Sequence, residues 1–343
     1  MKMLLLMILV VRFFLILIFF FSCTNERLSP FEIQGRTQGT FYSVKYYSNL
    51  NLIKKHSIDS ILFDIDMALS TYNDSSNITR VNNNSTTYVD TLLSDVISRS
   101  IEICNETEGA FDITVAPLVN SYGFGPKSTN FNTEYANFLG CDMISISDGL
   151  INKKNNIIQL DINGIAQGYS VDILSNYLKQ NNIDNFIINI GGEVYCSGNK
   201  NKNPWLVAIE KPYQNIQLQK YILKLSNKAL ATSGSYRKLK KIDGKIISHT
   251  MNPKTLKPAK NNLLSVSILA NNCMDADAYA TACMSMGLNK SKQFISTNNI
   301  DACFIYVEKD DTLTFMTNGM LKLISSESPD YSDLHPSLGA APQ

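Results

Sequence analysis

The sequence lacks several features that would assign it to a common functional class at once. None of its 7 cysteines forms a C-x-x-C pair, so a zinc ribbon or a thioredoxin-like site is not indicated. Its histidines number only 3, too few for a typical multi-histidine metal centre. Lys and Arg total 31 against 30 for Asp and Glu, and this net charge of +1 offers no strong field to a nucleic acid. We therefore expect no nucleic-acid partner.

Internal repeats and compositional extremes are also missing. Hydrophobic residues make up 44% and charged residues 18% of the 343 residues. That balance is typical of a globular protein and excludes a disordered, collagenous or coiled-coil chain. The length allows one large domain or two intertwined ones with an ample core.

The first 22 residues differ from this globular composition. Lys2 and Arg12 accompany an otherwise apolar run that ends at Ser22-Cys23, a pattern that predicts a secretory signal. Ser22-Cys23 resembles the lipobox of bacterial lipoproteins, in which the cysteine is lipidated and becomes the new N-terminus. We expect residues 1–22 to be a signal peptide and Cys23 to carry a lipid anchor. An uncleaved signal anchor that spans the membrane is the alternative.

Either alternative exports the rest of the chain and tethers it to a membrane. Residues 23–34 then form a short tether and 35–324 the folded body. The tail at 325–343 is rich in Ser, Pro and Asp, and we expect it to be disordered.

Six cysteines follow Cys23, each alone in its part of the sequence. Runs such as AYATACMSM and DACFIYV embed them among apolar residues, where single cysteines usually act as small core residues. An exported protein also permits disulfides, so their pairing stays open. These cysteines are Cys104, Cys141, Cys196, Cys273, Cys283 and Cys303.

Periodicity predicts mixed helices and strands. Apolar residues recur at helical spacing over 55–70, 92–104 and 274–286, and residues 161–180 predict the end of a strand, a turn and a helix. Because no regular βαβ alternation is visible, we expect an α+β fold with mixed sheets and packed helices. The predicted strands are 41–47, 186–190, 205–210, 221–225 and 263–269, followed by a terminal hairpin at 302–307 and 313–316.

Clusters of glycine, hydroxyl and acidic residues carry the chemical signal. Gly164 and Gly168 are predicted at the start of a helix, where bare N–H groups suit phosphate oxygens, although close strand–helix packing is the alternative. Asp277 and Thr281 are four residues apart, so a helix puts both oxygens on one face. Such a sparse oxygen set suits Mg²⁺ that also takes a carbonyl and substrate phosphates; a helix cap or a surface pair is the alternative.

Taken in order, these clusters resemble the motifs of the ApbE family of flavin transferases. Each motif is weakly specific alone, but eight occur in the family's order over roughly 35–320, nearly the whole exported body. The motifs are Gly39-Thr-Phe-Tyr42, Ser70-Thr-Tyr72, Gly109–Val119, Asp161–Asp172, Gly191-Gly-Glu193, Ala231–Arg237, His249–Pro253 and Ala276–Thr281.

The resemblance implies an ApbE-like, T-fold-related architecture and a Mg²⁺-dependent FAD:protein FMN transferase. Such an enzyme moves FMN from FAD to a threonine hydroxyl of a partner protein and releases AMP. The implied acceptors are flavin-carrying subunits of membrane redox complexes, and the lipid anchor at Cys23 would hold the enzyme at the periplasmic face of the bacterial inner membrane.

Two other functions remain open at this point. One is a Mg²⁺-dependent FAD pyrophosphatase that releases FMN and AMP. The other is a flavin-holding lipoprotein without catalysis, which has no need of Asp277, Thr281 or His249.

Matching positions give the residues that the resemblance implies. His249 is the catalytic candidate, acting as a general base or stabilising the transition state, and Gly164, Asp277 and Thr281 would hold the metal. Gln167 stands where the family often has Lys, which removes one positive charge from a phosphate-rich site. The residues implied in FAD binding are Gln38, in place of a common Met, with Tyr72, Ala110, Phe111, Asp112, Gln167 and His249.

The lipoprotein hypothesis predicts the behaviour of one variant. Cys23→Ala removes the thiol to which the lipid would be attached, so labelling by a radioactive fatty acid should disappear. The processing of the precursor, followed on a gel, should change in the same cells. Labelling equal to that of the wild type would contradict the hypothesis.

Overall fold

The computed structural model describes most of the exported body. The predicted signal peptide, Cys23, Arg237 and nearly all of the predicted tail lie outside the described residues. Within the part of the chain that the structure covers, no helix has the length and apolarity needed to cross a bilayer. The described ranges are 28–127, 133–210, 220–235, 239–242, 245–309 and 311–325.

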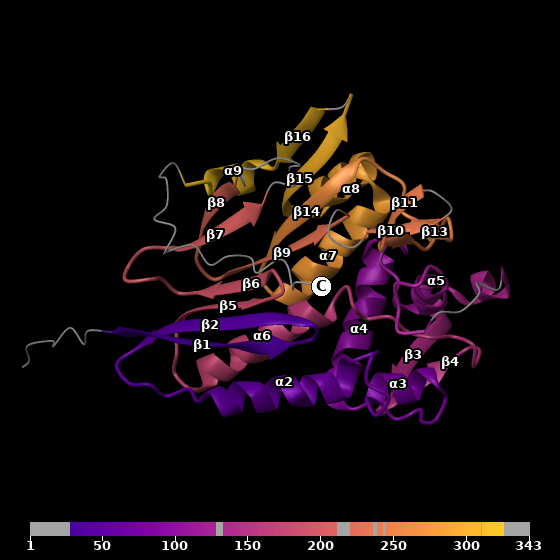
Figure 1. Cartoon of the computed structure of the whole chain (residues 1–343), viewed down its shortest axis with the longest axis horizontal. Helices are drawn as coiled ribbons and strands as arrows, with labels where there is room; N and C mark the ends of the chain where they lie inside the picture. The colour runs from indigo at the N-terminus through magenta and orange to yellow at the C-terminus, as the bar shows by residue number, and fades with distance from the viewer. Residues whose placement is uncertain are drawn as a thin grey trace, which may run out of the picture.

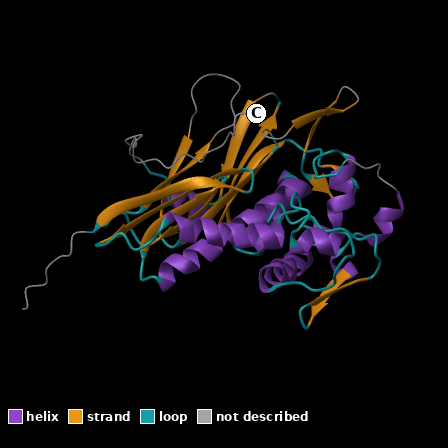
Figure 2. Cartoon of the chain, turned by 60° about the horizontal axis from the view of Figure 1, so that its bottom comes forward, coloured by secondary structure: helices purple, strands orange, loops and turns teal. Residues whose placement is uncertain are grey.

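One large antiparallel sheet is the main framework (Figures 1 and 2). Its strand order is β1-β2-β5-β6-β9-β14-β15-β16, and every neighbouring pair is antiparallel. The strands are β1 (Ser29–Thr37), β2 (Thr40–Ser48), β5 (Asn185–Ile190), β6 (Glu193–Ser197), β9 (Lys228–Gly234), β14 (Leu263–Ala270), β15 (Asp301–Glu308) and β16 (Asp311–Met316).

Both faces of the central strands are buried. In β5, Phe186 and Ile188 pack into the core beneath the helices, while Ile187 packs into a second core on the opposite face. The hairpin of β7 (Trp205–Glu210) and β8 (Lys220–Leu225) and the short α9 (Asn318–Lys322) contribute to that second core. This double burial explains why runs such as FIINI are continuously apolar, because neither face has to meet water.

The longer helices gather on one side of the sheet, as Figure 2 shows. Among them α7 is buried on nearly every side and packs against β9, β14 and α6. Its fully buried Ala276, Ala280 and Cys283 let neighbouring elements approach closely. The longer helices are α2 (Lys55–Leu69), α4 (Thr91–Glu106), α6 (Ala166–Gln180), α7 (Cys273–Met286) and α8 (Leu288–Thr297).

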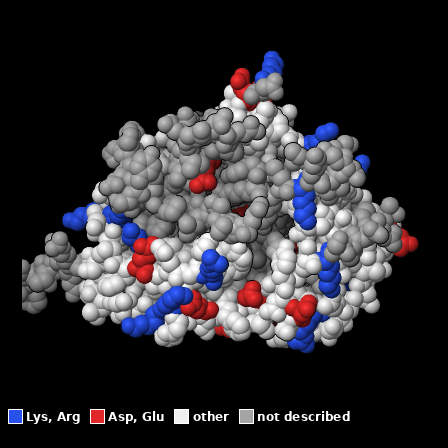
Figure 3. Space-filling view, viewed as in Figure 1, with Lys and Arg blue, Asp and Glu red and all other residues white. Residues whose placement is uncertain are grey.

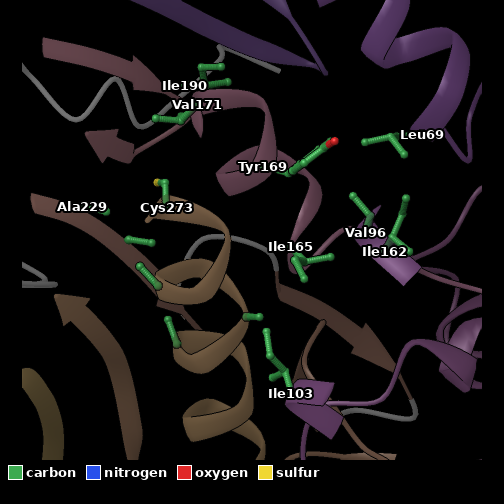
Figure 4. Close-up of a cluster of buried hydrophobic side chains, with 14 of the residues drawn as sticks. Leu69, Val96, Ile103, Ile162, Ile165, Tyr169, Val171, Ile190, Ala229 and Cys273 are labelled. Atoms are coloured by element: carbon green, nitrogen blue, oxygen red, sulfur yellow. The ribbon is translucent and has the colours of Figure 1, made fainter. Parts of the chain in front are cut away.

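Shorter elements complete the body next to α4 and β14. Figure 4 shows part of the core beneath the sheet, to which α4, α6 and α7 contribute side chains such as Ile103, Tyr169 and Cys273. The shorter elements are α3 (Asn77–Asn82), α5 (Ala116–Ser121), β3 (Ile144–Ser147), β4 (Leu150–Lys153), β10 (Leu239–Ile242), β11 (Lys245–Ser248), β12 (Met251–Asn252) and β13 (Lys257–Pro258), with 3-10 turns η1 (Ile113–Val115), η2 (Thr133–Phe138) and η3 (Cys141–Met143).

Helices α6 and α7 are joined by hydrogen bonds in both directions. The carboxylate of Asp172 on α6 accepts from the backbone N–H groups of Cys273 and Met274, both at 2.8 Å, and so caps the start of α7. In return, the N–H of Gly168 on α6 donates to the carboxylate of Asp277 on α7 at 3.1 Å. This reciprocal pairing joins the first two turns of α6 to the first two turns of α7.

The α+β prediction is confirmed, and the predicted helices and strands lie close to the observed ones. The predicted tether is wrong from Ser29 onward, because β1 begins there and pairs with β2 along its whole length. Phe31 and Ile33 pack against the core while Glu32 and Gln34 face outward, the alternation of a half-buried strand.

The strand expected just before α6 is also absent from the described chain. Leu160 is fully buried there, but its N–H and C=O bond to the side-chain amide of Asn82 at 2.7 and 2.9 Å. That amide takes the place of a neighbouring strand, so Gly164 lies in a turn that no strand directly precedes.

Two of the cysteines expected mainly as core residues pair instead. Cys104 and Cys141 form a disulfide. Cys196, Cys273 and Cys283 are buried thiols, as expected of core residues, and Cys303 is buried as well.

Because α6 and α7 approach closely at Gly168, adding one methyl group there should lower the stability of the protein. A Cβ at Gly168 would lie 2.7 Å from the backbone carbonyl carbon of Cys273 and 2.9 Å from Cβ of Asp277, which backbone atoms cannot relieve easily. Gly168→Ala should lower the free energy of unfolding by about 1–3 kcal/mol, measured by urea denaturation. Gln180→Ala, at the exposed end of the same helix, is the control. Equal stability of the two variants would contradict the packing described here.

Candidate active site

A cavity of about 940 Å³ opens beside the N-terminus of α6. Its size is near the upper end of small-molecule sites, roughly 300–1,000 Å³. Its walls come from the β1–β2 and β5–β6 turns, the end of α2, the loop after α4, the end of β9 and α7. Every residue proposed from the sequence lines it, although their roles stay predictions: Gln38, Tyr72, Ala110, Phe111, Asp112, Gly164, Gln167, His249, Asp277 and Thr281.

Two tight hairpin turns border the cavity. Gln38 and Gly39 join β1 to β2 with φ of 49° and 71°, and Gly191 and Gly192 join β5 to β6 with φ of 66° and 119°. Positive φ suits two-residue hairpins, because it matches the twist of the strands. Both turns lie at one end of the sheet, since the N–H of Gly191 donates to the carbonyl of Phe41 at 3.1 Å.

Polar side chains gather between these turns and α6. Nε2 of Gln38 donates to Oγ of Ser170 on α6 at 2.7 Å. Gln167, in the first turn of the same helix, approaches the other hairpin: a Cβ at Gly191 would lie 3.1 Å from its Nε2 and 3.3 Å from Oε2 of Glu193. Amides and a carboxylate therefore surround the helix N-terminus, where hydrogen bonds to an anionic ligand are favourable.

One wall of the cavity is aromatic. Tyr72 is 64% exposed and its hydroxyl donates to the carbonyl of Phe124 at 3.2 Å. Desolvation and the nearby Asp161 carboxylate raise the pKa of Tyr72, so the phenol stays neutral. The Phe124 ring meets the His249 imidazole edge to face, with centroids 6.3 Å apart. Tyr72, Phe124 and His249 thus provide ring surface to a flat ligand.

Ala110, Phe111 and Asp112 form the cavity loop after α4. Phe111 is only 4% exposed and packs into the core. Oδ1 of Asp112 accepts from the N–H and the hydroxyl of Thr114 at 2.8 and 2.7 Å, and so caps η1. Burial raises the pKa of Asp112. Because Oδ1 accepts both bonds from Thr114, this oxygen holds the loop in its observed conformation.

The oxygens of Asp277 and Thr281 and the backbone of Gly164 form a compact group. A Cβ at Gly164 would lie 2.9 Å from Oγ1 of Thr281, which is also 3.1 Å from Oγ of Ser233. Asp277 is 5% exposed, and burial raises its pKa to about 7. A buried carboxylate and a hydroxyl one helical turn apart, with the Gly164 backbone against the hydroxyl, offer oxygen atoms of the kind that a hard cation such as Mg²⁺ prefers. Among the described residues, no group of three or more His, Cys, Asp or Glu is arranged around a metal position.

The charged side chains among the described residues that line the cavity are all acidic. No Lys or Arg is among the described residues that line it, although both signs are scattered over the face in Figure 3. An anionic ligand would meet repulsion there unless a cation came with it. The six lining carboxylates are those of Asp66, Asp74, Asp112, Asp161, Glu193 and Asp277.

Several lining residues were not assigned from the sequence. Glu193 and Ser233 stood in the recognised motifs, and their places after a Gly-Gly turn and near the end of β9 could have identified them. Asp66 and Asp74 gave no local signal, because only the folding of α2 and of the segment that follows it brings them to the cavity.

The fold and the cavity define an α+β protein whose cavity suits a ligand with both a flat ring system and an anionic part. The chain belongs to the ApbE family, whose family model matches residues 38–304. The resemblance inferred from the motifs is thereby confirmed.

Individual relatives agree with this membership. The chain is 33% identical to the FAD:protein FMN transferase of Vibrio cholerae over 295 residues, which cover 81% of this chain and 88% of that protein. It is 31% identical to the FAD:protein FMN transferase of Haemophilus influenzae, covering 85% of this chain and 91% of that one. The enzyme class expected from the motifs agrees with these names.

Solved structures are similar over nearly their full length. The flavin transferase ApbE from Vibrio cholerae superimposes with a TM-score of 0.78 at 30% identity, covering 86% of this chain and 99% of that chain. The apo flavinyl transferase ApbE of Pseudomonas stutzeri gives 0.79 at 28% identity, covering 88% and 99%. The expected ApbE-like architecture is confirmed.

The burial of Asp277 predicts a pH-dependent gain from removing its charge. Its pKa of about 7 lies above the 3.8 of an unperturbed Asp, so the folded state loses stability as pH rises from about 4 to 7. In metal-free protein, Asp277→Asn should raise the melting temperature little near pH 4 and fully above about pH 7. Differential scanning calorimetry checks this, with exposed Asp64→Asn as the control. A gain that is the same at every pH would contradict the prediction.

Proposed function

We propose that the protein is a Mg²⁺-dependent FAD:protein FMN transferase that modifies a threonine hydroxyl of a partner protein and releases AMP. The names of the relatives support the transfer of FMN from FAD to protein. The observation that carries the proposal is that one cavity combines an aromatic wall, a helix N-terminus and the Asp277–Thr281–Gly164 oxygen group.

FAD suits this cavity because its two chemical parts match two regions of the wall. We assign the isoalloxazine ring to the neighbourhood of Tyr72 and the Ala110–Asp112 loop. The pyrophosphate would lie between Gln167, at the N-terminus of α6, and Asp277. The hydroxyl groups of Ser233 and Thr281 can donate to its oxygens.

Asp277, Thr281 and the carbonyl of Gly164 would hold the Mg²⁺. A bound Mg²⁺ neutralises charge on the pyrophosphate as its P–O bond breaks. Asp277 must be ionised to serve as a ligand, and its pKa near 7 makes that ionisation sensitive to pH. The absence of Lys and Arg from the described lining supports a metal as the source of positive charge.

The transfer itself exchanges one P–O bond for another. The threonine oxygen bonds to the phosphorus of the FMN half, the bond to the AMP half breaks, and AMP leaves with the bridging oxygen. His249 lies in the same cavity, and we assign it to take the proton from the threonine hydroxyl. Phe124, edge-on to the imidazole, limits the orientations of that ring.

Export and membrane attachment belong to the same proposal. The acceptors would be flavin-carrying subunits of membrane redox complexes at the periplasmic face of the bacterial inner membrane, with the enzyme anchored through Cys23. The Cys104–Cys141 disulfide supports an exported body, since such bonds persist mainly in oxidising compartments.

One reaction with purified components tests the proposal. The protein is incubated with FAD, Mg²⁺ and a threonine-containing acceptor domain, with an acceptor Thr→Val variant as control. Mass spectrometry should find an FMN adduct on the threonine and free AMP, and chelation of Mg²⁺ should abolish both. FMN and AMP without an adduct would make the protein an FAD pyrophosphatase instead. Unchanged FAD would reduce it to a flavin-binding protein.

Loss of His249 should affect turnover more than binding. His249→Ala should lower the transfer rate about 10²- to 10⁴-fold, the usual cost of removing a positioned acid–base group. FAD affinity should fall by a much smaller factor, because Tyr72, the Ala110–Asp112 loop and the helix N-terminus still line the cavity when the imidazole is lost. Single-turnover transfer, FAD titration and thermal melting on the same preparation separate a chemical from a structural role. A stable variant that transfers at the normal rate would remove His249 from the mechanism.

A further inference from the structure

The disulfide between Cys104 and Cys141 encloses part of the active-site wall. Cys104 lies in the last turns of α4 and Cys141 begins η3, 37 residues later. The segment between them includes the Ala110–Asp112 loop and Phe124, which line the cavity. The bond therefore joins the two ends of a chain segment that contributes both the Ala110–Asp112 loop and Phe124 to the cavity.

On the α4 side, hydrogen bonds join the start of the Ala110–Asp112 loop to the turn that carries the disulfide. The N–H of Gly109 donates to the carbonyl of Cys104 at 2.7 Å. Two residues further on, the N–H of Phe111 donates to Oγ1 of Thr107 at 3.1 Å. The start of the loop thus takes its position from the cysteine's own backbone.

On the η3 side, hydrogen bonds lead from the loop back to the other cysteine. Oδ1 of Asp112 accepts from the hydroxyl of Thr114 at 2.7 Å, and the same hydroxyl oxygen accepts from the N–H of Gly140 at 3.0 Å. Gly140 directly precedes Cys141. The sulfur–sulfur bond closes this path into a ring that runs through Cys104, Gly109, Asp112, Thr114 and Cys141.

We infer that the Cys104–Cys141 disulfide is a positioning element that holds the Ala110–Asp112 loop in its ligand-binding conformation. Thr114 is 1% exposed, so its bonds cannot be replaced by water while the segment is folded. Without the disulfide, the Gly140–Thr114 hydrogen bond alone would have to keep the two ends of the segment between these residues together. Closing that long segment costs conformational entropy. The loop would then sample other conformations, and ligand affinity falls with the fraction of competent molecules.

This inference rests on the proposed function, because FAD is the ligand used to test it. Cys104→Ala/Cys141→Ala removes the bond and leaves every residue that lines the cavity. Cys196→Ala is the control, since Cys196 is a buried thiol that packs into the core on the opposite face of the sheet. Both variants and the wild type are titrated with FAD well below their melting temperatures.

The double variant should bind FAD about 10-fold more weakly, as expected if one molecule in ten keeps the loop competent. The KM for FAD should rise by a similar factor while kcat at saturating FAD stays close to that of the wild type. Cys196→Ala should match the wild type in both constants. A purely structural disulfide would lower the melting temperature and leave the FAD affinity of the folded protein unchanged, and that result would overturn the inference.

Chemical reduction of the wild-type protein provides an independent measurement. Dithiothreitol supplies two electrons and two protons, which convert the bond to two thiols, while the reagent closes into its own cyclic disulfide. FAD affinity should fall in the wild type and in Cys196→Ala, and recover when oxidised glutathione re-forms the bond. If the double variant does not fold, this measurement decides, with circular dichroism confirming that the reduced protein remains folded. Unchanged affinity after complete reduction would overturn the inference, whereas no FAD binding by the oxidised wild type would refute the proposed function instead.

Discussion

The reciprocal hydrogen bonding of α6 and α7 is the constraint on which the site depends. Asp172 caps α7 with a carboxylate whose pKa burial raises to about 6, while Gly168 donates back to Asp277. Because only a hydrogen atom fits at Gly168, the helices are close enough for α7 to present Asp277 and Thr281 beside the turn at Gly164. A wider spacing would separate the oxygens that the proposed metal needs.

The antiparallel sheet supplies the second constraint. Since β2 pairs with β5, the turns that follow β1 and β5 emerge at the same end, and β9 ends near them with Ser233. Strand register therefore brings Gln38 and Glu193 to one rim, although they are far apart in sequence. The longer helices cover one face, so the N-terminus of α6 reaches this rim from below the sheet.

Much of the fold and most of the site could be predicted from local patterns. Helical spacing identified α2, α4 and α7, and motifs on short segments identified Asp277, Thr281 and His249, which share the cavity as the resemblance implies. Residues whose contacts depend on partners far away in the sequence could not be predicted from local patterns. Leu160 has a strand-like sequence but bonds to Asn82 instead, and the pairing of Cys104 with Cys141 required knowing that η3 returns to the end of α4.

The one-sided charge of the cavity connects stability with function. Asp277 is a net cost to the metal-free protein, because burial disfavours its ionised form and one N–H from Gly168 does not compensate fully. Within the proposed function, a cation alone would find few protein ligands, and a pyrophosphate alone would face carboxylates such as Asp161 and Glu193. The cation would offset the negative charge that repels the pyrophosphate, and the pyrophosphate would supply oxygen ligands to the cation. Binding of either one should therefore increase the affinity for the other. Under the proposed function, the unfavourable charge that weakens the metal-free fold would therefore be the same feature that makes the site selective for the pair.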